Sequence, residues 1–341
     1  MARLLFLAIL SISSYALSEN GSHLGFYLPT STMIPTNIKQ ASRSIFRVIV
    51  PNFEGQSLAQ FEVPSAAYTA FKNRFYSYKN IEITAKKTIA AQIQFCDQKI
   101  ISPCQIFLNT SSATGFMMNG VFWTNAHVVE PYFNEFELQK NKTSLLIFIF
   151  NQNDELVFNP LVDRISIYKL PNLNERAQQR NSFYSEETDF IGFKLAKNLA
   201  PSLRAASEEN LQQDLNQNLY ITGFAACTSC HESSDPSDSN DSLDRSPFPN
   251  STGRGMQVTF GPSLNLSSAA LKLGVPLPSL ARLAGQGVMF IHADSRQGMS
   301  GSPILNINGE VVGIFSGGKT MLKKGHLSRV SRGVRVQQLL H

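Results

Sequence analysis

The stretch Gly298-Met299-Ser300-Gly301-Ser302-Pro303 decides the fold of this chain. A serine hydroxyl becomes a nucleophile only when a base removes its proton, and the carbonyl that it attacks develops an oxyanion that needs N–H donors. Gly298 permits a tight turn that aims its own N–H and that of Ser300 at one point. The hexapeptide therefore predicts a nucleophilic serine ahead of a strand, and the alternative is a plain turn before a hairpin.

A candidate base follows a strand-like run over residues 115–123. In Thr124-Asn125-Ala126-His127 the histidine stands just after that run, where a strand end gives a base a fixed place. Taken alone, His127 is equally well interpreted as a histidine satisfied in a core or exposed on a loop. Its role depends on whether a partner acid is found elsewhere in the chain.

Asp189 is the candidate partner acid. It heads the apolar run Phe190–Leu195, so its carboxylate is expected to be buried at one end and to need a partner. The imidazole N–H of His127 is a suitable partner, because the contact fixes the tautomer and stabilises the imidazolium. A strand-capping aspartate is the alternative. Glu186 and Glu187 are rivals, although both lie in a more polar stretch.

In the order His127, Asp189, Ser300, the three motifs resemble those of the chymotrypsin/trypsin-like serine protease superfamily. The resemblance is closer to bacterial glutamyl endopeptidase-like and HtrA-like members, since no cysteine follows His127 and Ser302 replaces the more usual glycine. It covers residues 113–130, 186–196 and 286–340. It implies an all-β fold of two six-stranded antiparallel β-barrels, a site between them, and an oxyanion hole formed by the N–H groups of Gly298 and Ser300.

The resemblance also implies a substrate pocket. Asp294 lies where trypsin-like enzymes carry the acid that selects Arg or Lys, with Ser316 and Gly318 as further substrate-binding residues. Basic specificity stays open, because related bacterial enzymes carry this acid without it and Arg296 is placed to neutralise it. Glutamate specificity is less favoured, because Phe315 stands where such enzymes usually have histidine.

Activation by the digestive-enzyme switch is not expected. In those enzymes an aspartate directly before the nucleophile binds the new N-terminus after zymogen cleavage. Met299 occupies that position and cannot form an ion pair. Any propeptide is therefore expected to act by another route.

Short strand signals continue along the chain and favour an all-β barrel architecture. Asn308-Gly309 between two apolar runs is a strong hairpin signal. We expect a protease domain over 45–341, with a first barrel over about 45–200 and a second over about 201–341. Residues 19–44 are interpreted as an arm or a propeptide, residues 66–78 as helix-like, and Val334–Leu340 as a short terminal helix. The strand-like runs are 45–50, 145–150, 156–158, 165–170, 190–195, 219–224, 256–260, 288–292, 304–307 and 311–315.

The first 18 residues are interpreted as a signal peptide. Arg3 precedes an apolar run, and Ala16 and Ser18 are the small residues that precede a cleavage site before Glu19. No later apolar run is long enough to span a bilayer, so no membrane anchor is expected. We therefore expect a secreted or periplasmic protein.

Export implies an oxidising compartment, in which the four cysteines are expected to form disulfides. The favoured pairing is Cys96–Cys104 and Cys227–Cys230, although sequence alone leaves all three connectivities open. Cys227-Thr228-Ser229-Cys230-His231 also matches a c-type haem motif and offers zinc ligands. Its context is a polar loop over 228–252 rather than a helical domain, so a local disulfide is preferred.

The net charge of +5 is small and mixed with acids, so nucleic acid is not an expected partner. A basic stretch near the end is interpreted as a solvated face; it contains Lys319, Lys323, Lys324, Arg329, Arg332 and Arg335. The expected partners are protein or peptide substrates, with no cofactor and no metal. The competing hypothesis is a non-catalytic relative that binds a partner through the same cleft. An α/β-hydrolase is disfavoured, because its motif needs glycine at Ser302 and a base after the serine.

Overall fold

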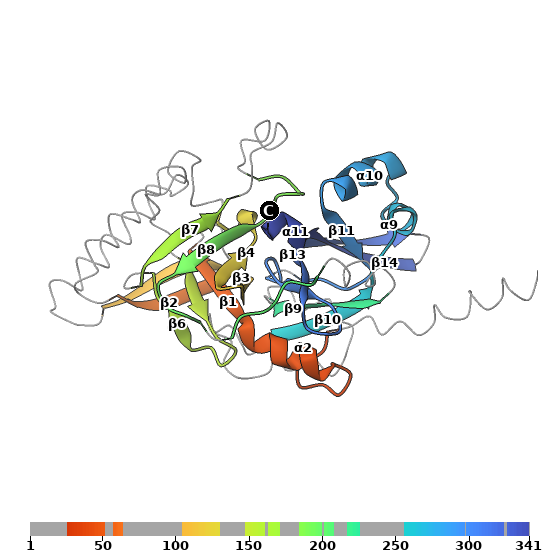
Figure 1. Cartoon of the computed structure of the whole chain (residues 1–341). Coiled ribbons are helices and arrows are strands. Elements are labelled where there is room, and N and C mark those ends of the chain that lie inside the picture. The colour runs from red at the N-terminus through yellow and green to blue at the C-terminus, as the bar shows by residue number, and fades with distance from the viewer. Residues whose placement is uncertain are drawn as a thin grey trace, which may run out of the picture.

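Two curled antiparallel β-sheets with a short C-terminal helix make up most of the described chain (Figure 1). This computed structural model describes residues 26–51, 57–63, 104–129, 147–160, 163–170, 184–199, 201–207, 217–225, 256–296, 298–323 and 326–340. The predicted all-β, two-barrel fold class is confirmed. The predicted signal peptide, the predicted helix at 66–78, the predicted loop at 228–252 and the side chains of all four cysteines lie outside the described part.

The first sheet has eight strands, in the order β6-β5-β1-β3-β4-β8-β7 with β2 also paired to β3. Six had been expected. Two strands account for the difference: β2 pairs with the first half of the 15-residue β3, and the predicted run over 115–123 is divided by a turn at Asn119-Gly120 into the end of β3 and a separate β4. The strands are β1 (Ile45–Pro51), β2 (Ser57–Val63), β3 (Cys104–Met118), β4 (Val121–Thr124), β5 (Phe148–Phe150), β6 (Leu156–Phe158), β7 (Ile165–Lys169) and β8 (Ile191–Leu195).

The second sheet has the six strands expected, in the order β10-β9-β12-β13-β14-β11. The Asn308-Gly309 turn joins β12 to β13, with Gly309 at a φ of 78° that favours glycine. The terminal helix α11 (Val336–Leu340) begins two residues later than predicted, because β14 continues to Arg335. The strands are β9 (Asn218–Phe224), β10 (Met256–Pro262), β11 (Val288–Ile291), β12 (Pro303–Leu305), β13 (Val311–Lys323) and β14 (His326–Arg335).

One hydrophobic core lies between the two sheets. Phe116 and Trp123 of the first sheet share it with Phe224 and Ile314 of the second and Leu339 of α11, all at most 2% exposed. Burial of apolar surface is the main favourable term in folding, and here both sheets must be present to complete it. The connecting segment is tied to both, since the Leu203 N–H donates to Met117 and the Ala206 N–H donates to Val311.

The N-terminal arm belongs to this core as well. Tyr27 exchanges two backbone hydrogen bonds of 2.8 Å with Val258 of β10. The helix α2 (Thr36–Ala41) follows, and its Ile38 is fully buried. A 3-10 turn (Ser42–Ser44) then leads into β1. The described part of the arm is therefore packed into the fold, and the helix was missed because six residues are too few for a clear period.

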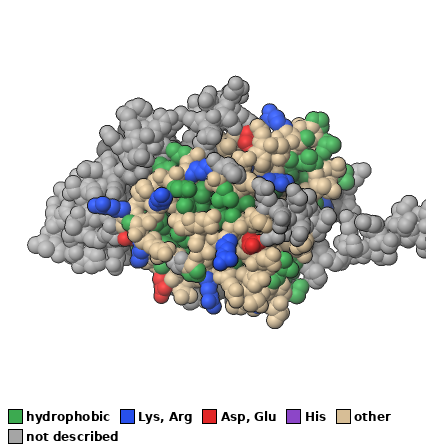
Figure 2. Space-filling model, in the orientation of Figure 1, with side chains coloured by type: hydrophobic (Ala, Val, Ile, Leu, Met, Phe, Trp, Pro, Cys, Tyr) green, Lys and Arg blue, Asp and Glu red, His purple; other side chains and the backbone are tan. Residues whose placement is uncertain are grey.

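Two further helices were not predicted. α9 (Leu266–Leu273) begins at Asn265, whose side chain accepts from the Ser268 N–H, and α10 (Leu277–Gly285) follows Pro276. They pack through Ala269 and Leu280 against β11 and β14 and lie side by side at one end of the second sheet (Figure 1). Within the described ranges, no helix has the length and apolarity needed to cross a membrane. Figure 2 shows Lys and Arg side chains spread singly over the face in view.

Candidate active site

His127 and Asp189 meet because β4 and β8 are antiparallel neighbours. Thr124, the last residue of β4, pairs with Ile191, the first residue of β8. The residues that follow β4 and those that precede β8 therefore lie at the same end of the two strands. His127 follows on the single-turn helix α5 (Ala126–Val129), and Asp189 lies in the turn before β8.

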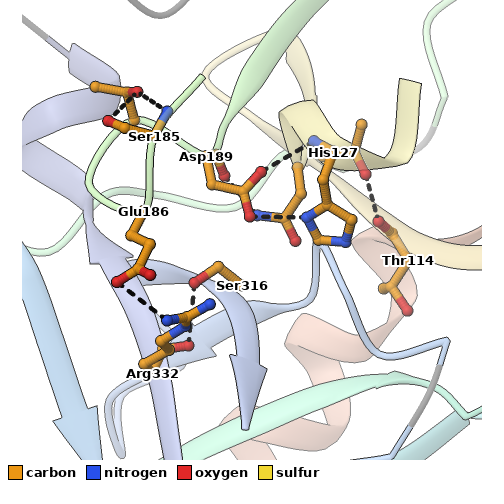
Figure 3. A network of polar contacts seen from close by, with 10 residues as sticks. Thr114, His127, Ser185, Glu186, Asp189, Ser316 and Arg332 are labelled. Atoms are coloured by element: carbon orange, nitrogen blue, oxygen red, sulfur yellow. Dashed lines mark hydrogen bonds and ion pairs between the residues drawn. The ribbon is translucent and has the colours of Figure 1, made fainter. Parts of the chain in front are cut away.

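The Asp189 carboxylate holds His127 with both oxygens (Figure 3). Oδ2 lies 2.7 Å from Nδ1 of the imidazole, and Oδ1 accepts the His127 backbone N–H at 3.0 Å. An ionised carboxylate only accepts, so Nδ1 is the donor in this contact, and Nε2 is then the acceptor nitrogen of a neutral imidazole. The His127 side chain is 31% exposed and that of Asp189 6%, so the acid is buried behind a base that faces outward.

The turn that presents Asp189 is fixed by local hydrogen bonds. The Ser185 N–H donates to Thr188 Oγ1 at 2.8 Å, and the Thr188 N–H donates to the Ser185 carbonyl at 3.0 Å. Asn125 adds a contact from the base's own segment, since its side-chain amide donates to the Asp189 carbonyl. The acid is therefore held by its own turn and by the segment that carries the base.

Ser300 lies on the tight turn that the sequence predicts. Gly298 and Gly301 have φ values of 88° and 86°, in the region that favours glycine. The Ser302 N–H donates to the Met299 carbonyl at 3.0 Å and closes the turn. A Cβ on Gly301 would lie 2.1 Å from the Thr114 carbonyl oxygen, so no side chain fits there. Both glycines are therefore required by the backbone.

The first sheet holds this turn by hydrogen bonds from β3. The Thr114 N–H of β3 donates to the Ser300 carbonyl at 2.8 Å, and its hydroxyl donates to the Gly298 carbonyl at 3.0 Å. The Cβ position of Gly301 lies 3.2 Å from the Asn125 nitrogen, two residues before His127. The fold thus packs the Ser300 turn against the segment that leads to His127. Among the described residues, the N–H groups of Gly298 and Ser300 donate to no protein acceptor.

The predicted substrate-binding residues also come together. Phe315, just before Ser316, accepts the Gly301 N–H and donates to the Ser302 carbonyl, so this strand lies beside the serine turn. A Cβ on Gly318 would lie 1.8 Å from Ser295 Oγ, and therefore the segment that carries Asp294 touches this strand.

Two arginines of the basic stretch form ion pairs that the sequence did not predict. Arg329 Nη1 donates to Asp294 Oδ2 at 2.6 Å, and Arg332 Nη1 lies 3.2 Å from Glu186 Oε2 (Figure 3 shows the second pair). Burial raises the pKa of Asp294, whereas Arg329 and Arg296 act in the opposite direction. Thr114 was missed as well. No local pattern marks these residues, because their partners are distant in sequence.

A trypsin-like peptidase domain matches residues 113–314, which is more than half of the chain. The chain therefore belongs to the trypsin-like peptidase family. The structure is similar to an inactive form of a mutant of Rv3671c from M. tuberculosis H37Rv, with 11% identity, 93% of each chain covered and a TM-score of 0.39. It is also similar to the active form of the Rv3671c protease from M. tuberculosis, with 12% identity, 90% of this chain and 82% of that chain covered and a TM-score of 0.42. No curated protein matches.

Proposed function

We propose that this protein is a serine endopeptidase in which Ser300 is the nucleophile, His127 the base and Asp189 the acid that orients the base. One observation carries the proposal: the Asp189 carboxylate binds both Nδ1 and the backbone N–H of His127 and leaves Nε2 as the basic nitrogen. The glycine-bounded Ser300 turn, packed against the same segment, supplies the nucleophile.

The chemistry follows the charges that develop. As Ser300 attacks a peptide carbonyl, its proton moves to Nε2 of His127, and the imidazolium is stabilised by Asp189. The N–H groups of Gly298 and Ser300 donate to the oxyanion. The imidazolium then protonates the leaving amine, and an acyl-enzyme forms. Water activated by the same nitrogen hydrolyses the ester and restores the serine.

Met299 supports activation without an N-terminal ion pair. Its side chain is fully buried in an apolar cluster with Ile304 and Phe315. An ammonium group brought to this site would be desolvated without a counter-charge from residue 299, which is costly. The turn is held instead by hydrogen bonds to β3 and β13.

We further propose that the substrates are exported proteins or peptides, met in a secreted or periplasmic setting. The N-terminal segment with its small residues before Glu19 supports export. On the face shown in Figure 2 the Lys and Arg side chains of the described residues are spread one by one and form no basic patch, which supports peptide rather than nucleic acid partners. Selection of Arg or Lys by Asp294, which the resemblance left open, is opposed by the ion pair with Arg329.

Substitution of the nucleophile tests the proposal. Ser300→Ala is expected to reduce peptide hydrolysis by about three orders of magnitude or more, because the members of such a triad act as a unit. Purified variants are assayed on a casein-type substrate and labelled with a fluorophosphonate. Ser267→Ala, on the exposed side of α9, is the matched control and should keep activity and labelling.

The outcomes separate the two functions that the sequence allows. Labelling of the wild type that is lost in Ser300→Ala supports the peptidase. A folded wild-type protein that neither reacts with the fluorophosphonate nor cleaves any substrate would contradict it and favour a non-catalytic binder.

A further inference from the structure

Two segments beside the Ser300 turn carry the residues that the family resemblance assigns to the pocket for the P1 residue, the residue whose carbonyl is attacked. Residues 294–296 precede the Ser300 turn. Ser316–Gly318 follow Phe315, which is hydrogen-bonded to that turn through both its N–H and its carbonyl. The argument that follows rests on the proposed function, because only attack by Ser300 places the P1 side chain there. The charges on these two walls then decide which side chains are accepted.

The acid on the first wall is already paired. β14 lies beside β11 with Ser331 opposite Ile291, and the Ser331 hydroxyl donates to the Ala293 carbonyl at 3.0 Å. This contact fixes the backbone just before Asp294 onto β14. Arg329 lies two residues before Ser331, and its Nη1 is 2.6 Å from Asp294 Oδ2. The Arg329 side chain is 32% exposed and that of Asp294 7%. The ion pair is thus partly shielded from water, where screening is weaker than at a free surface.

Two further arginines add positive charge to the same walls. The Arg296 guanidinium acts electrostatically on Asp294 and stacks on the ring of Phe26 at 4.1 Å. The Arg332 guanidinium lies beside Gly317: its Nε and Nη2 are 3.8 Å and 3.9 Å from the position that a Cβ on Gly317 would take. Asp294 pairs with Arg329, and Glu186 pairs with Arg332. A lysine or arginine at P1 would therefore add a fourth cation and would have to displace Arg329.

We propose that Arg329 is a specificity-determining residue that occupies Asp294 and excludes basic side chains from P1. The enzyme then cleaves after uncharged side chains, although it carries the acid that a basic pocket requires. Release of Asp294 by removal of the Arg329 guanidinium converts the pocket to one that accepts Lys and Arg. Discrimination of this kind rests on repulsion as much as on attraction.

Paired peptides test the wild type directly. Two peptides that differ only in Met or Lys at P1 have side chains of similar length and different charge. We expect kcat/KM for the Met peptide to exceed that for the Lys peptide by about tenfold or more, given the usual cost of a like-charge contact. A wild-type preference for Lys would overturn the inference. Absence of both cleavage and fluorophosphonate labelling would instead contradict the proposed function.

Two variants test the mechanism. Arg329→Gln is expected to shift the Lys-to-Met ratio of kcat/KM toward Lys by about tenfold or more, because Asp294 is then free to bind a cation. Asp294→Asn keeps Arg329 and is expected to leave the Lys peptide disfavoured. Arg282→Gln, an exposed arginine on α10, is the control and should leave the ratio unchanged.

The two variants are informative in different ways. If Asp294 selects basic residues in the wild type, Asp294→Asn abolishes Lys cleavage, and the inference is wrong. An unchanged ratio in folded Arg329→Gln would also overturn it. Should Arg329→Gln fail to fold, the wild-type pair and Asp294→Asn still decide the question.

Discussion

At the scale of single residues, Thr114 connects the two sheets at the point where the chemistry is proposed. Its hydroxyl donates to the Gly298 carbonyl and accepts the Phe224 N–H at 2.9 Å, and its side chain is fully buried. Its carbonyl accepts the Thr124 hydroxyl at 2.8 Å. One residue therefore orients the peptide that follows Gly298 and is itself oriented by the strand that leads to His127. Thr114 is a positioning residue in this scheme.

Thr114→Val is expected to lower kcat by about tenfold to a hundredfold with little change in KM. Loss of a hydrogen bond that leaves a buried partner unsatisfied costs about 1–3 kcal/mol, and here the partners shape the oxyanion turn. Thr114→Ser retains the hydroxyl and should restore most of the rate. The measurement is steady-state kinetics together with the rate of fluorophosphonate labelling. Equal rates for the Val variant and the wild type would show that the hydroxyl has no role in positioning.

The site residues that the sequence predicts are those whose motif is local. The motifs around His127, Asp189 and Ser300 are short, and their order along the chain makes them recognisable together. Thr114 and Arg329 are not marked in this way, because Thr114 lies 184 residues from Gly298 and Arg329 lies 35 residues from Asp294. Such contacts depend on strand register, and register is set by the whole sheet rather than by a short window. The ion pairs of Arg329 and Arg332 within the basic stretch were not predicted for the same reason.

At the scale of elements, the strands were easier to predict than the helices. Runs such as Leu156–Phe158 and Asn218–Phe224 are short, apolar and bounded by turn residues, which is a sufficient signal. The helices α2, α9 and α10 have six, eight and nine residues. So few turns give little periodicity, and their stability comes from packing against distant strands. The split of β3 between β1 and β2 was likewise invisible without its partners.

The helix α2 provides a test of whether the arm is part of the folded domain. Ile38→Ala removes a fully buried side chain and is expected to lower the free energy of unfolding by about 2–5 kcal/mol. Gln40→Ala, on the exposed side of the same helix, is the control and should change it by less than about 0.5 kcal/mol. Denaturant titration measures both. Equal stability for the two variants would mean that the arm is dispensable to the core.

At the scale of the whole molecule, the shared core predicts that both sheets unfold together. Trp123 is the only tryptophan of the chain, is 2% exposed and lies in β4 of the first sheet. Leu339 of α11 is 1% exposed and belongs to the same cluster. Because both sheets contribute to this cluster, we expect them to unfold in one cooperative transition. Tryptophan fluorescence should therefore respond to a change made in the C-terminal helix.

Leu339→Ala is expected to lower the stability reported by Trp123 fluorescence by about 2–5 kcal/mol, because a buried side chain leaves a cavity. Leu340→Ala is the matched control, since the Leu340 side chain is 49% exposed. Far-UV circular dichroism and fluorescence should give coincident midpoints in each variant. Two separated transitions, with fluorescence unaffected by Leu339→Ala, would show that the sheets are independent.

The hydrogen bonds from Thr114 to the Ser300 turn have a consequence for the synthesis of the chain. The base and the acid at 127 and 189 are made long before residue 300, and the turn takes its shape only when β3 and β13 hold it from both sides. The core that fixes those strands also needs Val336 and Leu339. A growing chain therefore lacks the folded Ser300 turn while most of it is being translated. Under the proposed function, the order of synthesis itself delays proteolysis until the C-terminal strands are in place.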